Sequence, residues 1–336
     1  MNGVTPHTMS REMTPVKPKV YIDGKEGTTG LQIYDRLSAR EDIELLLIDE
    51  DKRKDVEERK KLLNAADIVF LCLPDAAAIE AVGLVENPDT RIIDASTAHR
   101  IAPGWVYGFP ELKPGQRQAI AGAKRVANPG CHATGFISVV APLVELGLLP
   151  RDADLSCFSL TGYSGGGKKM IAQYEGPDKT EQMCSPGIYG VTQNHKHLPE
   201  MQVICGLTKP PVFSPIVDDY YKGMATTVPL HREQLKGVTT LHELWQAYAD
   251  YYGTYDGRRL VYAAGDPTDE AGGIAASSKF YGAAKAGHND LTIVVAGNDK
   301  AFTVTALFDN LGKGASGAAV QNMNLMLGLE ETTGLV

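Results

Sequence analysis

The sequence lacks several features that would place the protein in a broad class at once. Its five cysteines include no C-x-x-C pair, which argues against a disulfide framework and a zinc ribbon and fits a reducing cytoplasm. Its 33 Lys and Arg residues are outnumbered by 41 Asp and Glu, and the net charge of -8 argues against nucleic acid as a partner. No stretch approaches the roughly 20 consecutive apolar residues that cross a bilayer, so no membrane association is expected.

The N-terminal segment also lacks an apolar core. Residues 1–17 mix charged residues, His and Pro, a composition typical of a disordered tail and unlike a signal peptide. The whole chain of 336 residues is 43% hydrophobic, which is enough to bury one or two sizeable cores without metals or disulfides. We therefore expect two domains.

Strand-like and helix-like segments alternate in the first part of the chain. The run Lys19–Asp23 predicts a buried strand, and three further strand-like runs follow it. These runs lie at residues 43–48, 67–73 and 91–94, with helix-like stretches at 52–63 and 75–86. The alternation is typical of a parallel, doubly wound sheet, so the first domain is predicted to be α/β.

The pattern changes beyond residue 150. Strand-like segments at 154–161, 224–230, 291–295 and 302–307 accompany an amphipathic helix at 241–252. They predict an α+β domain with a largely antiparallel sheet. Residues 162–222 are rich in Gly, Pro and polar groups, and connections of this length usually carry function. An apolar helical segment at 317–329 closes the chain.

Glycines recur at every third position directly after the first strand. Gly24, Gly27 and Gly30 form a G-x-x-G-x-x-G turn that also contains Thr28 and Thr29. Glycine lets a pyrophosphate approach the backbone, and the N-terminus of the following helix offers free N–H groups to it. The turn therefore predicts a dinucleotide site, although a tight turn without a ligand would have the same spacing.

Charges of both signs follow the second strand. At this position an acidic residue prefers the free ribose hydroxyl of NAD, and cations accept the 2′-phosphate of NADP. Here an acidic run, 49–51, precedes Lys52 and Arg53. The segment permits NADP(H), with Arg53 as the candidate contact, but a solvated helix start explains these charges equally well.

Cys131 lies in a polar segment flanked by glycines. Asn128-Pro129-Gly130-Cys131 leads into an apolar helical stretch, with Asn128 as the expected N-cap and Pro129 in the first turn. Cys131 would then lie in the first helical turn, where free N–H groups and the helix dipole favour a thiolate. Cysteines inside apolar runs are expected to be core residues, so Cys131 is the candidate nucleophile.

A thiolate nucleophile needs a proton acceptor, and His195 and His197 form the dense candidate. In extended chain they would face the same side. The pair could suit zinc, but the surrounding sequence offers no convincing third ligand, so no metal is expected; surface histidines are the other alternative. Glu200 could orient an imidazole, as in a nucleophile–base–orienter arrangement.

Two further clusters suit an anionic substrate. Arg100 follows the fourth strand, at the edge where α/β sheets bind ligands, and could pair with a phosphate or carboxylate bidentately. The run 163–169 supplies N–H groups and two cations, and predicts an anion-binding loop unless it is a flexible surface hairpin. The candidate binding residues of this loop are Ser164, Gly165, Gly166 and Lys168.

Taken in order, these segments resemble the short-form N-acetyl-gamma-glutamyl-phosphate reductases, relatives of aspartate-semialdehyde dehydrogenase and glyceraldehyde-3-phosphate dehydrogenase. The resemblance extends from about residue 18 to the end. Residues 21–30 look like the opening of that subgroup, and 128–131 look like the family's nucleophile motif. Residues 195–200 are similar to its H-x-H-x-P-E motif.

The resemblance implies a fold and an activity. The fold is a Rossmann-type NADP-binding domain over 18–130 and 308–336, joined to a glyceraldehyde-3-phosphate dehydrogenase-like catalytic and oligomerisation domain over 131–307. The activity is NADPH-dependent reductive dephosphorylation of N-acetyl-γ-glutamyl phosphate to N-acetylglutamate 5-semialdehyde in arginine biosynthesis, through a thioester on Cys131. A cytoplasmic homodimer or homotetramer is expected. Rival hypotheses are another acyl-phosphate reductase, acting on aspartyl or aminoadipyl phosphate, and a non-catalytic NADP-binding regulator.

The resemblance also assigns roles to residues. His197 becomes the acid–base residue with Glu200 as its partner, and His195 is left to the substrate anion site. Segment 309–324 looks like the superfamily's terminal helix, which packs beside the nicotinamide. Further cofactor contacts implied in this way are Ser96, Asn310 and Gly312. Most relatives carry Tyr-Pro-Thr after the nucleophile, whereas this chain has His132-Ala133-Thr134, which places another titratable group beside Cys131.

Overall fold

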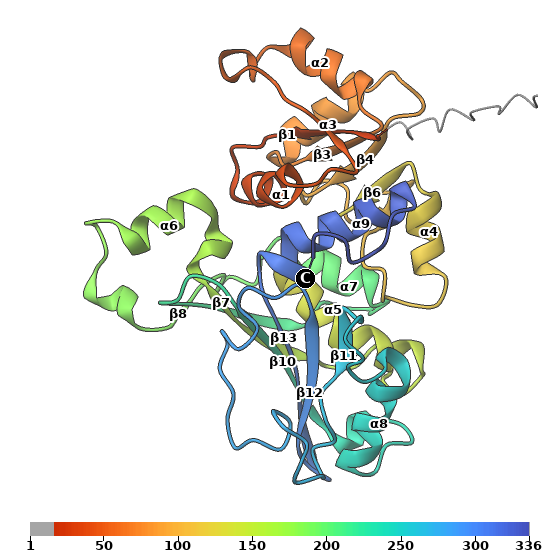
Figure 1. Cartoon of the computed structure of the whole chain (residues 1–336). Coiled ribbons are helices and arrows are strands. Elements are labelled where there is room, and N and C mark those ends of the chain that lie inside the picture. Colours follow the sequence, from red (N-terminus) through yellow and green to blue (C-terminus); the bar gives the residue numbers. More distant parts are fainter. Residues whose placement is uncertain (1–16, 336) are drawn as a thin grey trace, which may run out of the picture.

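A computed structural model describes residues 17–335, so the predicted tail lies outside the described residues except for its last residue. The chain forms two sheets with their helices, one above the other in Figure 1. The C-terminal helix, drawn in blue, lies between them. The predicted α/β, two-domain class is confirmed by the two sheets.

The first sheet is parallel and has six strands in the order β2-β1-β3-β4-β6-β5. Its strands are β1 (Lys19–Asp23), β2 (Glu44–Leu46), β3 (Ile68–Leu71), β4 (Arg91–Asp94), β5 (Val106–Tyr107) and β6 (Arg125–Ala127). Its helices are α1 (Thr28–Ser38), α2 (Val56–Ala65), α3 (Asp75–Leu84) and α4 (Gln116–Gly122). All four residues of β3 are buried, as expected for a strand covered on both faces. The strand order reverses between β1 and β3, so a ligand is expected beyond the carboxyl ends of these two strands.

The second sheet has seven strands in the order β11-β12-β13-β10-β7-β9-β8. Its strands are β7 (Ser156–Gly162), β8 (Gly187–Ile188), β9 (Val212–Asp218), β10 (Met224–His231), β11 (Val261–Ala263), β12 (Leu291–Asn298) and β13 (Ala301–Phe308). The sheet is mixed, since β7 pairs parallel with β9 and β11 parallel with β12, while the long central pairs of β10 and β13 are antiparallel.

Helices cover one face of this sheet and complete its core. They are α5 (Cys131–Glu145), α7 (Leu198–Ile204) and α8 (Leu241–Tyr252), whereas α6 (Gly167–Glu175) lies to the side of the sheet (Figure 1). The predicted helix at 241–252 is confirmed as α8, which begins with a capping box between Thr240 and Glu243. α5 is buried along most of its length, and Phe136 and Leu143 pack in one cluster with Phe302 of β13. This packing fixes the start of α5, where Cys131 lies.

The chain returns to the first sheet at its C-terminus. A π-helical turn, Gly312–Ser316, leads into α9 (Gly317–Leu327), which confirms the predicted terminal helix. Val320 and Met323 of α9 share a buried cluster with Val20 and Ile68 of the first sheet. Of the helices that the structure describes, no single one has the length and apolarity to cross a membrane.

Candidate active site

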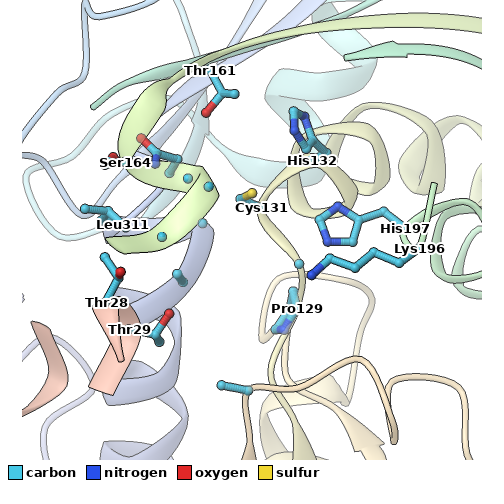
Figure 2. Close-up of a pocket in the computed structure, with 18 of the residues that line it drawn as sticks. Thr28, Thr29, Pro129, Cys131, His132, Thr161, Ser164, Lys196, His197 and Leu311 are labelled. Atoms are coloured by element: carbon cyan, nitrogen blue, oxygen red, sulfur yellow. Dashed lines mark hydrogen bonds between the residues drawn. The ribbon is translucent and has the colours of Figure 1, made fainter. Parts of the chain in front are cut away.

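A cavity of about 470 Å³ lies beyond the carboxyl ends of β1, β3 and β4, where the two halves of the chain meet. Its walls come from segments far apart in sequence: the glycine turn, the start of α5, and the loops around 161–170, 195–197 and 310–315. Figure 2 shows the Cys131 sulfur facing the open space between the Ser164 segment and His197. The polar segments singled out by sequence therefore meet at one place.

Cys131 is the first residue of α5, but the expected N-cap is wrong. Gly130 occupies that position, without a side-chain cap. Asn128 is used elsewhere, because its amide donates to the carbonyl of Ala315 at 3.0 Å and its oxygen accepts from Asn322 at 3.2 Å. Asn128 therefore ties the nucleophile segment to the C-terminal helix, and the first N–H groups of α5 stay free of a capping side chain.

The helix start favours the Cys131 thiolate as expected, but burial outweighs this effect. Burial raises the pKa of the Cys131 thiol, because protein surrounds the side chain although part of it remains accessible. The backbone N–H of His132 and the charges of Arg100 and Lys196 act in the opposite direction and offset this rise only in part. The thiol therefore needs a base to give up its proton.

His197 is the candidate for that base, because its side chain lies against the nucleophile segment. A Cβ added at Gly130 would lie 2.4 Å from Nη1 of Arg100 and 2.4 Å from Nε2 of His197, so glycine lets both side chains approach the nucleophile's backbone. Burial, and then the Arg100 charge, lower the pKa of His197 well below its usual value, which keeps the imidazole neutral. Among the described residues its Nδ1 has no hydrogen-bond partner.

Glu200 does not orient this imidazole, contrary to the sequence-based prediction. One carboxylate oxygen accepts from Arg100 at 2.9 Å, and the other accepts from the Tyr107 hydroxyl at 2.7 Å and the Gly130 N–H at 2.9 Å. The turn from His197 into α7 places the carboxylate behind the nucleophile segment, where these donors engage both of its oxygens. Glu200 therefore positions Arg100 and the backbone before Cys131.

The two neighbours of His197 in sequence reach the same cavity. His195 is half-buried, and its Nδ1 accepts from the His197 backbone N–H at 3.2 Å. Lys196 also lines the cavity, and in Figure 2 its side chain extends toward Pro129. The sequence pattern did not point to Lys196, because alternation along an extended chain would turn it away from the face shared by the two histidines. The segment is a turn before α7 and brings all three residues to the cavity.

The predicted anion-binding loop lies partly in the cavity. Ser164, Gly165 and Gly166 line it, and the Asn310 amide donates to the Ser164 hydroxyl at 3.0 Å. Lys168 does not line it: this residue is exposed and lies 3.9 Å from the carboxylate of Glu26. The reason is that α6 begins at Gly167 and carries the lysine outward.

The glycine turn borders two cavities. Gly27, Thr28 and Thr29 line the first, and a second of about 530 Å³ is lined by the rest of the turn up to Glu26 and by the segment after β2. Gly24 has a φ of 88°, and the Cβ of a larger residue there would meet the Cys72 carbonyl oxygen 2.4 Å away. Gly30 supports the turn from within, because its Cβ position is 2.4 Å from the Gly24 carbonyl oxygen.

Some of the residues predicted to bind the cofactor line one of these two cavities, and others do not. Arg53 lines the second cavity together with Lys54, whereas Lys52 lies near Asp49 and Glu58. Gly30, which supports the turn from within, lines neither cavity, and two residues outside the turn do not line them either.

These two are Ser96 and Gly312. Ser96 is buried and donates to Asp94 at 2.7 Å, which closes the turn after β4. Gly312 is buried where a Cβ would lie 2.4 Å from the His288 carbonyl oxygen. Both therefore shape the backbone next to the cavity, and Leu311, Gly314 and Ala315 line it instead. The Oγ1 of Thr28 is buried without a hydrogen-bond partner in the described part of the chain, so this cavity-lining residue has an unused polar atom for a ligand.

Comparison with known proteins assigns this site to a family. The chain matches a semialdehyde dehydrogenase NAD binding domain over residues 19–121 and a semialdehyde dehydrogenase dimerisation domain over 131–310. N-acetyl-gamma-glutamyl-phosphate reductase 2 of Nostoc sp. is 47% identical over 325 residues, which cover 95% of this chain and 99% of that protein. The chain belongs to the N-acetyl-gamma-glutamyl-phosphate reductase family. A further member, from Trichormus variabilis, is 48% identical over 95% of this chain and 99% of its own length.

Solved structures agree on the fold of this reductase family member. Aspartate semialdehyde dehydrogenase II of Vibrio cholerae, complexed with ASA, superposes with a TM-score of 0.68 over 93% of this chain and 98% of that one, at 16% identity. The enzyme of Candida albicans, solved with NADP, gives a TM-score of 0.61 over 93% of this chain and 99% of its own, at 12% identity. Both likenesses confirm the two-domain α/β fold.

Proposed function

We propose that this protein reduces N-acetyl-γ-glutamyl phosphate with NADPH to N-acetylglutamate 5-semialdehyde and releases phosphate, as the names of its relatives indicate. One observation carries the proposal: Cys131, at the start of α5, shares a cavity with a neutral His197 and with two cations, Arg100 and Lys196. A nucleophile, a base and an anion-binding group are what attack on an acyl phosphate requires.

In the proposed reaction, His197 first accepts the Cys131 thiol proton. The thiolate attacks the acyl carbon, and the phosphate leaves with the electrons of the broken C–O bond and takes a proton from solvent. Bound NADPH supplies the hydride that reduces the resulting thioester. His197 returns its proton to the thiohemiacetal oxygen and takes it back as the C–S bond breaks, which leaves the aldehyde and a thiolate. The first N–H groups of α5 would stabilise the oxyanion.

The two cations differ in their availability to the substrate. The charge of Arg100 is balanced by Glu200, 2.9 Å away, so it acts mainly by hydrogen bonding. Lys196 has no carboxylate within 4.0 Å among the described residues, so its charge is available to a phosphate or carboxylate. With the N–H groups around Ser164, Lys196 is the proposed binding site for the leaving phosphate.

The residues present fit a dinucleotide. The cavity around the nucleophile and the second cavity both border the glycine turn and share Leu73 in their walls. In the first cavity Thr28 offers a hydroxyl that has no partner among the described residues. In the second cavity Arg53 and Lys54 supply cations at the end of β2. We assign the 2′-phosphate of NADP to these cations and the pyrophosphate to the N-terminus of α1.

The outer face of the second sheet is the proposed contact between subunits of a homodimer. Phe158, Ile188 and Val212 on β7, β8 and β9 are exposed to 39%, 66% and 63%, and the matching family model is described as a dimerisation domain. Exposed apolar surface of this kind is typical of an interface.

We place the enzyme in the cytoplasm, where a reducing environment preserves the Cys131 thiol. The domain limits proposed above, 18–130 with 308–336 and 131–307, follow the same division.

The reverse reaction tests the function without an unstable acyl phosphate. N-acetylglutamate semialdehyde, phosphate and NADP+ are mixed with the protein, and the absorbance of the reduced cofactor is followed, with Cys131→Ser as the control. Aspartate semialdehyde and aminoadipate semialdehyde are offered separately. A higher kcat/KM for either of these would show that it, and not N-acetylglutamate semialdehyde, is the substrate. NADP+ binding without turnover of any of the three semialdehydes would favour a non-catalytic regulator.

A further inference from the structure

His132, which directly follows the nucleophile, lies in a chain of hydrogen bonds that the proposed reaction does not use. Its Nδ1 is 2.8 Å from the Ser159 hydroxyl, and its Nε2 is 2.6 Å from the Tyr189 hydroxyl. The Ser159 hydroxyl in turn lies 2.7 Å from that of Thr226. His132 is 3% exposed, so no bulk water competes for these partners.

The chain of bonds ends in the cavity. Tyr189 and His132 both line it beside Cys131, and Figure 2 shows the His132 ring next to the nucleophile. Tyr189 is held by its backbone, since its N–H donates to the Pro215 carbonyl at 3.1 Å. At the other end, Ser159 and Thr226 lie buried on β7 and β10, in the middle of the second sheet.

His132 cannot serve as a second base for Cys131, because both ring nitrogens already have partners. The groups around it are the imidazoles of His195 and His197, with ring centroids 5.6 and 5.7 Å away, and the ring of Phe213 at 5.3 Å. Burial lowers the pKa of His132 to about 3, with the charge of Lys196 and His195 adding to the effect. The ring is therefore neutral and carries one N–H.

A neutral ring permits two directions of hydrogen bonding along the chain. In one, the Tyr189 hydroxyl donates to Nε2, and Nδ1–H donates to Ser159. In the other, Ser159 donates to Nδ1, and Nε2–H donates to the Tyr189 oxygen. In this second direction the hydroxyl hydrogen of Tyr189 is free to point into the cavity, so the tautomer of His132 sets whether Tyr189 can donate to a ligand.

We propose that His132 is a positioning residue that holds the Tyr189 hydroxyl as a hydrogen-bond donor to an oxygen of the anionic substrate. This role rests on the proposed function, since it concerns the same cavity and the same carboxylate- and phosphate-bearing ligands. Tyr189 binds the substrate oxygen directly, and His132 acts through Tyr189. Proton transfer stays with His197, so the contribution falls on substrate binding and leaves the chemical step nearly unchanged.

The test compares two amides at position 132. The side-chain amide of His132→Gln reaches the place of Nε2 and can still hold Tyr189, whereas that of His132→Asn reaches only the place of Nδ1 and keeps the Ser159 contact. We expect His132→Asn to raise the KM of the semialdehyde or of phosphate about ten- to a hundredfold, the value of one hydrogen bond to a charged group. His132→Gln should stay within about threefold, and kcat should change by less than about threefold in both.

Tyr189→Phe and the double variant with His132→Asn complete the experiment. Tyr189→Phe should raise the same KM as His132→Asn, and the double variant should be no worse than either single variant, because one interaction is lost in all three. Equal KM values for Asn and Gln at 132, or additive losses in the double variant, would overturn the inference. Circular dichroism and thermal unfolding identify any variant that fails to fold. A wild-type protein without turnover overturns the proposed function, whereas an active wild type with unaffected variants overturns this inference alone.

Discussion

Replacing Gly130 by alanine tests whether the close approach of Arg100 and His197 to the nucleophile segment matters for turnover. The backbone of Gly130 has φ of -79° and ψ of 145°, which alanine adopts without strain, so the effect comes from the added methyl group. That methyl would lie 2.4 Å from both Arg100 and His197, whereas an ordinary contact begins at 3.4 Å. Each side chain must therefore move by about 1 Å. A displacement of this size in a catalytic group lowers kcat/KM by about 10²-fold, or about 2.7 kcal/mol of barrier.

The same substitution at Gly83 is the matched control. Gly83 lies in α3, and nothing lies within 4 Å of its Cβ position. Alanine there should stabilise the helix by about 0.5–1 kcal/mol and leave turnover unchanged. Turnover is measured by the reverse assay, and stability by urea unfolding. If Gly130→Ala stays within about threefold of wild-type kcat/KM, then Arg100 and His197 do not act from the positions assigned to them.

Four further predictions concern the nucleophile, the cofactor, the base and pH. Cys131→Ser should abolish turnover while NADP+ binding measured by fluorescence persists; more than about a tenth of wild-type kcat, under about 1.4 kcal/mol, would refute covalent catalysis. Arg53→Ser should lower the ratio of kcat/KM for NADP+ to kcat/KM for NAD+, and an unchanged ratio would show that the 2′-phosphate binds elsewhere. His197→Asn should lower kcat by about 10²–10⁴-fold and His195→Asn should mainly raise KM, and a larger kcat loss for His195→Asn would reverse the roles. Burial depresses the pKa of His132 and His197, so below about pH 6.5 these two imidazoles bind protons in the unfolded chain but not in the folded one. The free energy of unfolding should therefore fall on acidification, by up to about 1.4 kcal/mol per pH unit for each histidine. His132→Phe should reduce this pH dependence, measured by urea unfolding from pH 7 to 5, and an unchanged dependence would contradict the argument.

Local patterns predicted the elements of this fold well. The buried run of β3, the apolar spacing of α8 and the glycine turn after β1 depend on residues close in sequence, so spacing alone reveals them. The combination of parallel and antiparallel pairing in the second sheet was harder to predict from the sequence. Whether β7 pairs parallel or antiparallel with its neighbours depends on how the long segment before β9 crosses the sheet, and a strand's own residues do not encode that.

The sequence by itself determined most of the candidates for the chemistry: Cys131 among polar groups, the two histidines and Arg100, but not Lys196, and it wrongly placed Lys168 at the cavity. Only the tertiary structure decided what each of them faces. Glu200 was expected beside His197 because both lie in one short segment, yet the start of α7 turns its carboxylate toward Arg100 and Gly130. Residues that are close in sequence are predictable neighbours only within one regular helix or strand. Burial, which sets the pKa of the thiol and the imidazole, depends on segments brought together from across the whole chain.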